Sequence, residues 1–392
     1  MPNTNRMRSV LALCLLLATF AVAGCVGARM GVSWPSVGLI TVNGEQNIAL
    51  AYNNNVAVLN PVNGAPLRLI NPVNGAPMLD SENNPRSWIL RGSDFGGEQF
   101  YSLPIVVDDE TMLIAANSGN LLNVDSVLID VRRTFQLDDK VVANVLAVDN
   151  TIFIPYQDGG ISAYSLDDLY APLWRFPTEE GIWATPLLVG DLLIASSVDH
   201  HLYALDQSSG RLVWSLDLGG SVASTPLLAN DRLYVGSFNK SFFEISLDGE
   251  ILSSYATQNW VWGTPAIDEN GVVYLADLSG YVHALDSGRN LEPIWSSQIA
   301  ERGIRAGPMV YLDRVIVASR DGRVYWLDRR DGALINSREI DNRPELLGEM
   351  QLLEPSEDLN IDVPLLIVSS VDEGRLLIAF ELDGREAWVY PR

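Results

Sequence analysis

The chain is poor in cysteine. Its 392 residues contain only two, Cys14 and Cys25, both near the amino terminus. A disulfide framework or a cysteine-based metal centre needs more thiols at closer spacing. The sequence therefore predicts a protein held together by its hydrophobic core, and it has the material for one, because 47% of its residues are hydrophobic and 19% are charged.

Positive charge is also scarce. The chain has 26 Lys and Arg residues against 49 Asp and Glu residues, which gives a formal net charge of −23. Nucleic-acid binding draws most of its affinity from Lys and Arg at phosphates, so this balance excludes nucleic acid as a partner. An acidic surface of this kind keeps an exported protein soluble.

Histidine is the third scarce residue. The three in the chain are His200, His201 and His283. The first two are adjacent, and neighbouring residues on a strand point to opposite faces, so the pair does not form a metal site. The sequence also lacks a recognisable Ser, His, Asp arrangement and a glycine-rich phosphate loop. We expect no catalytic residue, no metal and no cofactor.

No apolar run is long enough to span a membrane. Residues 10–22 are apolar but too short. Arg6 and Arg8 precede this run, and residues 22–25, Val-Ala-Gly-Cys, follow it, which resembles the lipobox of a bacterial lipoprotein signal. We expect residues 1–24 to be a signal peptide, Cys25 to be the lipidated residue, and residues 25–36 to be a tether. The protein would then be exported and held on the cell envelope, on its periplasmic or extracellular side, by lipid alone.

What the chain does contain is a repeat. Residues 184–216 recur in diverged form from Ser224, Gly263 and Ala306. The prolines that head these copies are 40, 39 and 43 residues apart, a spacing typical of a four-stranded propeller blade. We predict an all-β fold: a β-propeller over residues 37–392, with eight four-stranded blades, or seven if one diverged copy is misread.

Each copy has the turns and the bulky residue that such a blade needs. Short apolar runs alternate with turn residues, and Asp206 and Gly210 are suited to the turn before the last strand. A tryptophan lies four residues beyond that glycine, where it can wedge one blade against the next. The tryptophans at this position are Trp174, Trp214, Trp295 and Trp388.

The first copy departs from this pattern. A gap-free overlay from Ile40 puts Arg68 at the tryptophan position, which weakens the wedge there. Residues 60–66, Asn-Pro-Val-Asn-Gly-Ala-Pro, are then repeated without change as residues 71–77. We interpret the duplication as a loop extension and expect a loop insertion at about residues 71–102.

The segment Ala-Leu-Asp-Gln-Ser-Ser-Gly-Arg-Leu-Val-Trp, residues 204–214, resembles the tryptophan-docking repeat of the pyrroloquinoline-quinone-like propellers. Two branches of these propellers differ in function. Quinone-dependent dehydrogenases use a pair of adjacent cysteines and a calcium-binding set, and this chain has no counterpart of the pair. Lipid-anchored propellers resembling the outer-membrane-protein assembly factor BamB bind other proteins and catalyse nothing.

The resemblance to the second branch implies a non-enzymatic scaffold for protein–protein interaction. Its partner would be one or more proteins, such as a β-barrel insertase, and its task would be the assembly of membrane β-barrel proteins. The alternatives are a quinone-dependent dehydrogenase and a cell-surface binding propeller unrelated to barrel assembly.

Aromatic and basic residues are expected along one rim of the ring. The positions three before each head proline should line the rim where the chain enters each blade, and the turns between second and third strands return to it. Aromatic residues and arginine are enriched in interface hot spots. We therefore predict a partner-binding rim formed by Tyr101, Trp183, Trp262, Arg305, His200, Asn239, Lys240 and Arg323.

Overall fold

The structure is a computed structural model that describes residues 34–392 except positions 43, 72, 358 and 392, and residues 34–392 form one compact unit. The expected signal peptide and Cys25 lie outside the described residues. Within the described part of the chain, no helix has the length and apolar character needed to cross a membrane.

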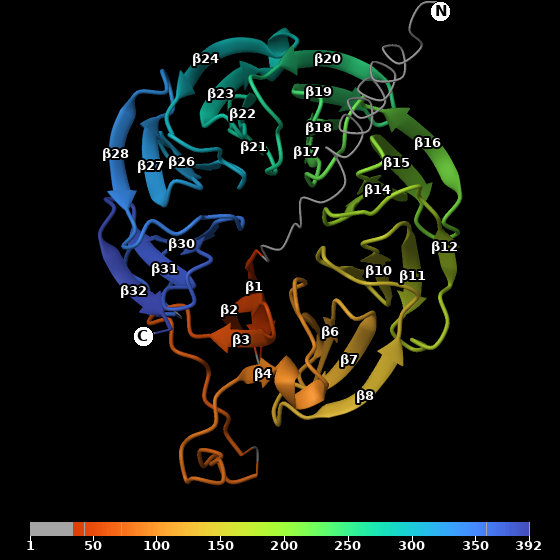
Figure 1. Ribbon diagram of the computed structural model, residues 1–392, viewed down its shortest axis with the longest axis vertical. Helices are drawn as coiled ribbons and strands as arrows, with labels where there is room; N and C mark the ends of the chain where they lie inside the picture. Colours follow the sequence, from red (N-terminus) through yellow and green to blue (C-terminus); the bar gives the residue numbers. More distant parts are fainter. Residues whose placement is uncertain (1–33, 43, 72, 358, 392) are drawn as a thin grey trace, which may run out of the picture. The chain divides into compact units, whose positions relative to one another are not determined.

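Eight antiparallel sheets of four strands each are arranged as a ring (Figure 1), which confirms the predicted eight-bladed propeller. In every blade the four strands are consecutive in sequence and pair in sequence order. The strands of the first four blades are β1 (Ser36–Val42), β2 (Glu45–Tyr52), β3 (Asn55–Leu59) and β4 (Ile89–Arg91); β5 (Ile105–Asp108), β6 (Thr111–Ala115), β7 (Asn120–Asp125) and β8 (Val131–Gln136); β9 (Leu146–Val148), β10 (Thr151–Pro155), β11 (Ile161–Ser165) and β12 (Trp174–Phe176); β13 (Leu187–Val189), β14 (Leu192–Ser196), β15 (His201–Asp206) and β16 (Leu212–Asp217).

The last four blades follow the same plan. Their strands are β17 (Leu227–Ala229), β18 (Arg232–Ser237), β19 (Ser241–Ser246) and β20 (Ile251–Ala256); β21 (Ala266–Ile267), β22 (Val272–Ala276), β23 (Tyr281–Asp286) and β24 (Glu292–Gln298); β25 (Met309–Tyr311), β26 (Arg314–Ala318), β27 (Arg323–Asp328) and β28 (Leu334–Glu339); β29 (Gln351–Leu353), β30 (Leu365–Ser369), β31 (Leu377–Glu381) and β32 (Glu386–Tyr390). Two 3-10 turns, η1 (Gly92–Phe95) and η2 (Ser287–Arg289), complete the described elements.

The turn before the outer strand has the expected chemistry. In blade four Asp206 Oδ1 accepts a hydrogen bond from the Ser209 amide at 2.9 Å, and Gly210 adopts a φ of +67°. Most side chains can adopt a positive φ only at a cost, so the glycine is required here. The pairing of β15 with β16 then shifts register between Ala204 and Leu205, as a β-bulge does.

The core is divided among the blade interfaces. Eight clusters of buried hydrophobic side chains occur in the described residues, and each draws its members from two neighbouring blades. The middle strands are apolar on both faces, since each blade is covered by others on both sides. In β14, for example, four of the five residues are buried.

Tryptophans on outer strands reach the neighbouring blade. Each donates its indole N–H to a backbone carbonyl of the next blade in the ring. These bonds join Trp174 to Gln207 (2.9 Å), Trp214 to Leu247 (2.8 Å), Trp295 to Arg329 (2.9 Å) and Trp388 to Pro61 (3.0 Å).

The ring closes between blades eight and one without exchange of strands. Trp388, which is 4% exposed, contributes to the cluster formed with Ile48 and Leu59 of blade one and Leu365 of blade eight. The same contact between an indole N–H and a carbonyl that joins neighbouring blades inside the ring therefore also joins two segments more than 300 residues apart in sequence.

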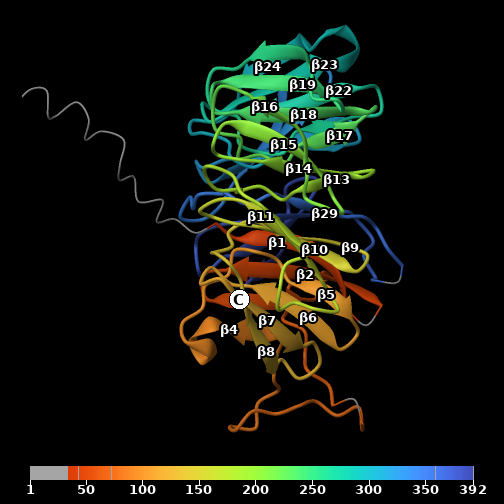
Figure 2. The ribbon, with the colours of Figure 1, turned by 90° about the vertical axis from the view of Figure 1, so that its right-hand side faces the viewer.

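The first blade corrects one prediction. The tryptophan position is not Arg68 but Trp88, which is 2% exposed and donates its indole N–H to the Ser126 carbonyl of blade two at 2.7 Å. The gap-free overlay was wrong because residues 60–88 lie between β3 and β4 and displace the outer strand along the sequence. Of the expected insertion, 71–102, residues 71–88 belong to this segment, whereas Ile89–Arg91 is β4 and Gly92–Phe95 is η1. The segment projects from the ring (Figures 1 and 2).

Candidate functional site at the mouth of the central channel

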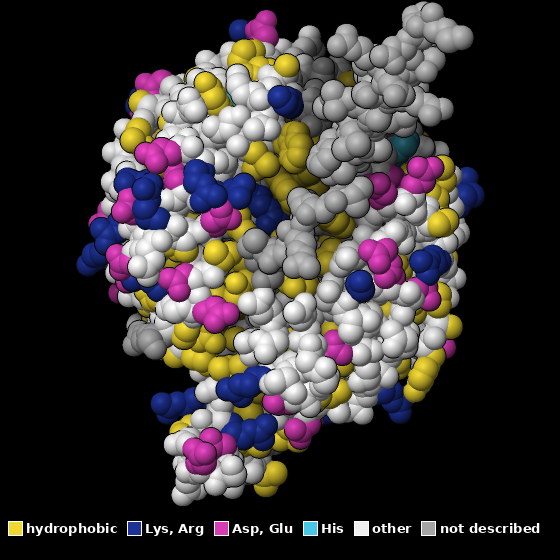
Figure 3. Space-filling view, in the orientation of Figure 1, with side chains coloured by type: hydrophobic (Ala, Val, Ile, Leu, Met, Phe, Trp, Pro, Cys, Tyr) yellow, Lys and Arg dark blue, Asp and Glu magenta, His cyan; other side chains and the backbone are white. Residues whose placement is uncertain are grey.

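A cavity of about 120 Å³ lies where the chain enters the innermost strands. Its lining comes from seven of the eight blades, which places it on the axis of the ring. Figure 3 shows hydrophobic side chains around the hollow at the centre of this face, with Lys and Arg side chains beside it. The lining side chains that matter for its chemistry are Trp34, Asn144, Trp183, Thr185, Thr225, Trp262, Thr264, Arg305 and Glu349.

Five aromatic rings and one guanidinium group form a continuous row across this mouth. We call it the aromatic row; its members, in order, are Trp260, Phe238, Trp262, Arg305, Trp34 and Tyr101. Phe238 lies 4.7 Å from Trp260 and 5.0 Å from Trp262 between ring centroids. At the other end, Trp34 lies 6.2 Å from Tyr101.

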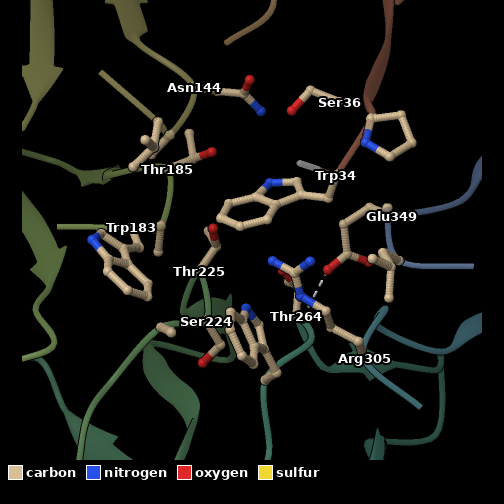
Figure 4. A pocket seen from close by; sticks show the side chains of 18 of the residues that line it. Trp34, Ser36, Asn144, Trp183, Thr185, Ser224, Thr225, Thr264, Arg305 and Glu349 are labelled. Atoms are coloured by element: carbon tan, nitrogen blue, oxygen red, sulfur yellow. Dashed lines mark hydrogen bonds between the residues drawn. The ribbon is translucent and has the colours of Figure 1, made fainter. Parts of the chain in front are cut away.

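Arg305 links the two halves of the row. Its guanidinium carbon lies 4.2 Å from the centroid of the Trp262 ring and 4.0 Å from that of Trp34, so an indole covers each face of the cation. Figure 4 shows Arg305 reaching from one wall of the cavity toward Trp34, with Trp183 across from it. The residue is 9% exposed, and among the described residues no carboxylate lies within ion-pair distance of it.

The electrostatics of the cavity are set by Arg305 and Glu349. Burial lowers the pKa of Arg305 to about 9, and the attraction of Glu349 opposes this shift. The carboxylate of Glu349 faces the cavity and accepts hydrogen bonds from the amides of Thr264 (3.2 Å) and Gly307 (2.7 Å). Desolvation by the surrounding ring raises the pKa of Glu349 above its ordinary value, although these two amides and Arg305 favour the charged form. The cavity thus holds one cation whose two faces are covered by indole rings and one carboxylate held by two backbone amides.

The expected rim residues fall into two groups. Trp183, Trp262 and Arg305 line the cavity, and Tyr101 joins the row through Trp34. Trp183 also donates its indole N–H to the Gln157 carbonyl at 3.3 Å. The entry positions before the head prolines are therefore brought together at one place.

The turn residues lie outside the cavity lining. His200 is exposed in the turn before β15, with a φ of +80°, and its carbonyl accepts a bond from the Leu218 amide. Asn239 donates its side-chain N–H to the Leu218 carbonyl at 2.6 Å, and Lys240 is exposed beside it. Arg323, at the start of β27, pairs with Glu339.

Sequence reasoning missed three members of the row. Trp34 was assigned to the tether, although β1 begins only two residues later, at Ser36. Trp260 is two positions before Trp262, and 41% of its surface is exposed. Phe238 occupies the turn after β18. The signal that could have found them is the presence of aromatic residues just before the first strand of blades one and six and in the turn after the second strand of blade five.

The site offers recognition chemistry. Aromatic faces and a fixed guanidinium bind planar, aromatic or anionic groups. In the described part of the chain, no three His, Cys, Asp or Glu residues are grouped as they would be to hold a metal ion.

The ring of tryptophan-docked, four-stranded blades defines this protein as an eight-bladed propeller built from pyrroloquinoline-quinone-like repeats. A family model described as "Outer membrane protein assembly factor BamB" matches residues 157–345 and 247–391, more than half of the chain. The chain belongs to this family.

Individual relatives are more distant. The BamB of Moranella endobia is 21% identical over 253 residues, which cover 60% of this chain and 54% of the relative. The BamB of Pseudomonas aeruginosa is 24% identical over 180 residues, or 42% of this chain and 46% of the relative. The chain spans about half the length of these curated relatives.

Two solved structures share the fold over most of the chain. The crystal structure of BamB from Moraxella catarrhalis matches with a TM-score of 0.62 at 15% identity, covering 87% of this chain and 95% of that one. The computationally designed protein Ika8 matches with a TM-score of 0.63 at 12% identity, covering 88% and 96%. These likenesses show the fold.

Proposed function

We propose that this chain is a non-enzymatic scaffold that binds proteins during the assembly of membrane β-barrel proteins. Its family is named for outer membrane protein assembly. The observation that carries the proposal is the aromatic row, because aromatic side chains and arginine are the residue types enriched in the hot spots of protein interfaces.

The partner docks on the channel-mouth face in this proposal. Trp260, at one end of the row, is open to solvent and stacks on Phe238 with an interplanar angle of 5°. Loops on a rigid scaffold commonly carry binding residues. Tyr101, Trp260, Trp262 and Arg305 lie in loops between blades, and Phe238 lies in the turn between β18 and β19. A side chain that stacks on the exposed face of Trp260 would extend the row.

Co-purification from the membranes of the source organism tests this function. The tagged chain should recover a β-barrel insertase, and Trp260→Ala should reduce that recovery at least tenfold while the melting temperature stays near that of the wild type. Leu312→Ala is the matched control, since Leu312 is an apolar side chain, 70% exposed, in the turn between β25 and β26 at the opposite face. Unchanged recovery with Trp260→Ala would place the partner elsewhere, and a different class of recovered partner would overturn the assembly role.

We also propose that the protein is held on the envelope by lipid at Cys25. The support is the sequence of residues 22–25 and the short apolar run before it. Cys25→Ser should release a folded propeller into the soluble fraction, because several acyl chains on one residue hold a protein firmly on a membrane and the variant cannot carry them at this position. Retention in membranes after a high-salt wash would argue against lipid as the anchor.

A further inference from the structure

The same seven-residue sequence occurs twice in blade one, in two different surroundings. Residues 60–66 and 71–77 both read Asn-Pro-Val-Asn-Gly-Ala-Pro. Both fold alike: the glycine amide donates to the carbonyl of the first asparagine at 2.9 Å, in Gly64 to Asn60 and in Gly75 to Asn71. The side chains of these two asparagines each accept from the valine amide, also at 2.9 Å. The described residues of the two copies therefore make the same hydrogen bonds.

The first copy is a socket for a tryptophan. The indole of Trp388 donates its N–H to the carbonyl of Pro61 at 3.0 Å. Its ring lies directly over Gly64, where an added Cβ would come within 2.3 Å of Trp388 Cε3. The turn thus supplies both a hydrogen-bond acceptor and a flat surface on which the indole packs, and a side chain larger than that of glycine would block this surface.

Other docked tryptophans of the ring also pack on the glycine of the turn in the next blade. Trp174 lies over Gly210 and Trp295 over Gly332, where an added Cβ would be 2.4 and 2.5 Å from the ring. The φ angles of these glycines are +67° and +69°, against +67° for Gly64. The conformation of the turn is therefore the common element in tryptophan docking, while the surrounding sequence varies.

The second copy has this conformation and no occupant among the described residues. Gly75 has a φ of +68°, and nothing lies within 4 Å of an added Cβ. Val73 is 92% exposed, whereas Val62 in the first copy is 37% exposed. The counterpart of Pro61 is Pro72, which lies outside the described residues. The segment extends away from the ring (Figure 2), so a partner can approach it.

We infer that residues 71–77 form a second tryptophan socket, which receives an indole side chain from a β-strand of a partner protein. A tryptophan is the occupant because the identical turn at residues 60–66 already binds one. A strand carries it because the described docked tryptophans of blades three, four, six and eight lie on outer strands. Ile70 and Leu79, which flank the socket and are 44% and 49% exposed, supply apolar surface for that strand. This surface is separate from the channel mouth, and the inference does not rest on the proposed function.

A peptide from the chain itself provides the probe. A closed hairpin of residues 377–390, with 5-fluorotryptophan at position 388, is titrated into the full mature protein and followed by ¹⁹F NMR and by the Gly75 amide resonance. We expect saturable shifts of both signals, and no binding by the same hairpin with Trp388→Leu.

Two matched glycine variants identify the site. Gly75→Val should weaken hairpin binding at least tenfold because its side chain covers the surface on which the indole would pack. Gly44→Val is the control: Gly44 also has a positive φ, +77°, and nothing within 4 Å of an added Cβ, but it lies in the turn between β1 and β2. Both variants should melt at similar temperatures, so a folding defect is recognised separately from a binding defect.

Three results would overturn the inference. Equal hairpin binding by Gly75→Val and wild type would place the peptide elsewhere, and absence of binding at millimolar hairpin would remove the socket. If sedimentation shows that the wild type dimerises and Gly75→Val alone is monomeric, the strand comes from a second copy and the assignment to a different partner protein is wrong.

Discussion

A docked tryptophan joins blades eight and one, where the ring closes, and another joins blades four and five inside the ring. The two tryptophans differ in how deeply they are buried. Trp388 is 4% exposed, whereas Trp214 is partly buried, yet both donate to a carbonyl in the turn of the next blade and lie over its glycine. The closing contact has to join segments that are remote in sequence, at the entropic cost of closing a long loop. The comparison shows that ring closure here needs no exchanged strand, because the docking of one tryptophan and its apolar cluster supplies the contact.

Other interfaces replace the indole by smaller groups. Between blades seven and eight, Asn336 of β28 donates its side-chain N–H to the Asp383 carbonyl at 2.8 Å. Between blades two and three, Arg133 of β8 lies over the ring of Tyr170, 5.7 Å from its centroid. At these two interfaces the group at the tryptophan position still reaches the next blade, but it buries less apolar surface there than an indole does.

The largest effect is expected where the ring closes. Trp388→Ala should lower the free energy of unfolding by about 3 to 5 kcal/mol, as truncation of a buried tryptophan does. Trp214→Ala should cost less because Trp214 is less buried. Chemical denaturation measures both, and hydrogen exchange should show faster opening of β1 and β2 only in Trp388→Ala. Equal costs would mean that burial does not distinguish the two interfaces.

The next largest loss of stability is expected at Gly64, over which the Trp388 ring lies. Gly64→Ala should cost about 2 to 5 kcal/mol, since it adds the strain of a positive φ, about 1 to 2 kcal/mol, to a clash with the Trp388 ring, about 1 to 3 kcal/mol. Gly75→Ala has the same φ without the ring and should show the strain alone. Thermal melts of the two variants separate the contributions, and identical losses would show that the ring contact is not the cause.

Blade six departs from the regular blades in a way that pH can test. In blades four, five and seven a serine at the end of the second strand donates its hydroxyl to a carbonyl of the preceding loop; these serines are Ser197, Ser237 and Ser319. Blade six has Asp277 at this place, which accepts from the Gln258 and Asn259 amides. Asp277 is fully buried, and its Oδ2 lies 3.5 Å from Nε2 of His283, which is also buried.

The pKa of Asp277 lies below its ordinary value of 3.8. Burial by itself raises this pKa, but His283 and the amides of Ser279 and Tyr281 together outweigh burial. Because the folded-state pKa is below the unfolded one, the carboxylate stabilises the fold above about pH 4, and this contribution is lost as the pH falls through the folded value. Asp277→Asn should therefore cost about 2 kcal/mol at pH 7, and the difference from wild type should shrink by pH 3. A difference that is constant between these pH values would contradict this role of the charge.

The smallest effect is expected at the interface between blades seven and eight. Asn336→Ala removes one hydrogen bond and little apolar area, so it should cost about 1 kcal/mol. Asn336→Asp, which keeps the size but not the donor, should cost at least as much in denaturant melts. A loss as large as that of Trp388→Ala would show that the hydrogen bond, rather than apolar burial, dominates these contacts.

The sequence alone determined the architecture, because a repeat of about 40 residues with turn residues at fixed places leaves few folds open. It also determined that Trp262 and Arg305 belong to one rim, since equivalent positions in equivalent blades face the same side. It misplaced the tryptophan of blade one, because an insertion breaks the register on which an overlay depends.

Only the tertiary structure decided which side chains meet. Phe238, Trp262, Arg305 and Trp34 come from distant parts of the chain, and nothing in their local sequence indicates that two indoles enclose one guanidinium. The two copies at residues 60–66 and 71–77 make the same point. Their sequence is identical, and the described hydrogen bonds and the φ of the glycine are the same, because local hydrogen bonds and glycine fix a turn. Trp388 occupies one of them because ring closure brings β32 to Pro61, and that contact exists only in the folded ring.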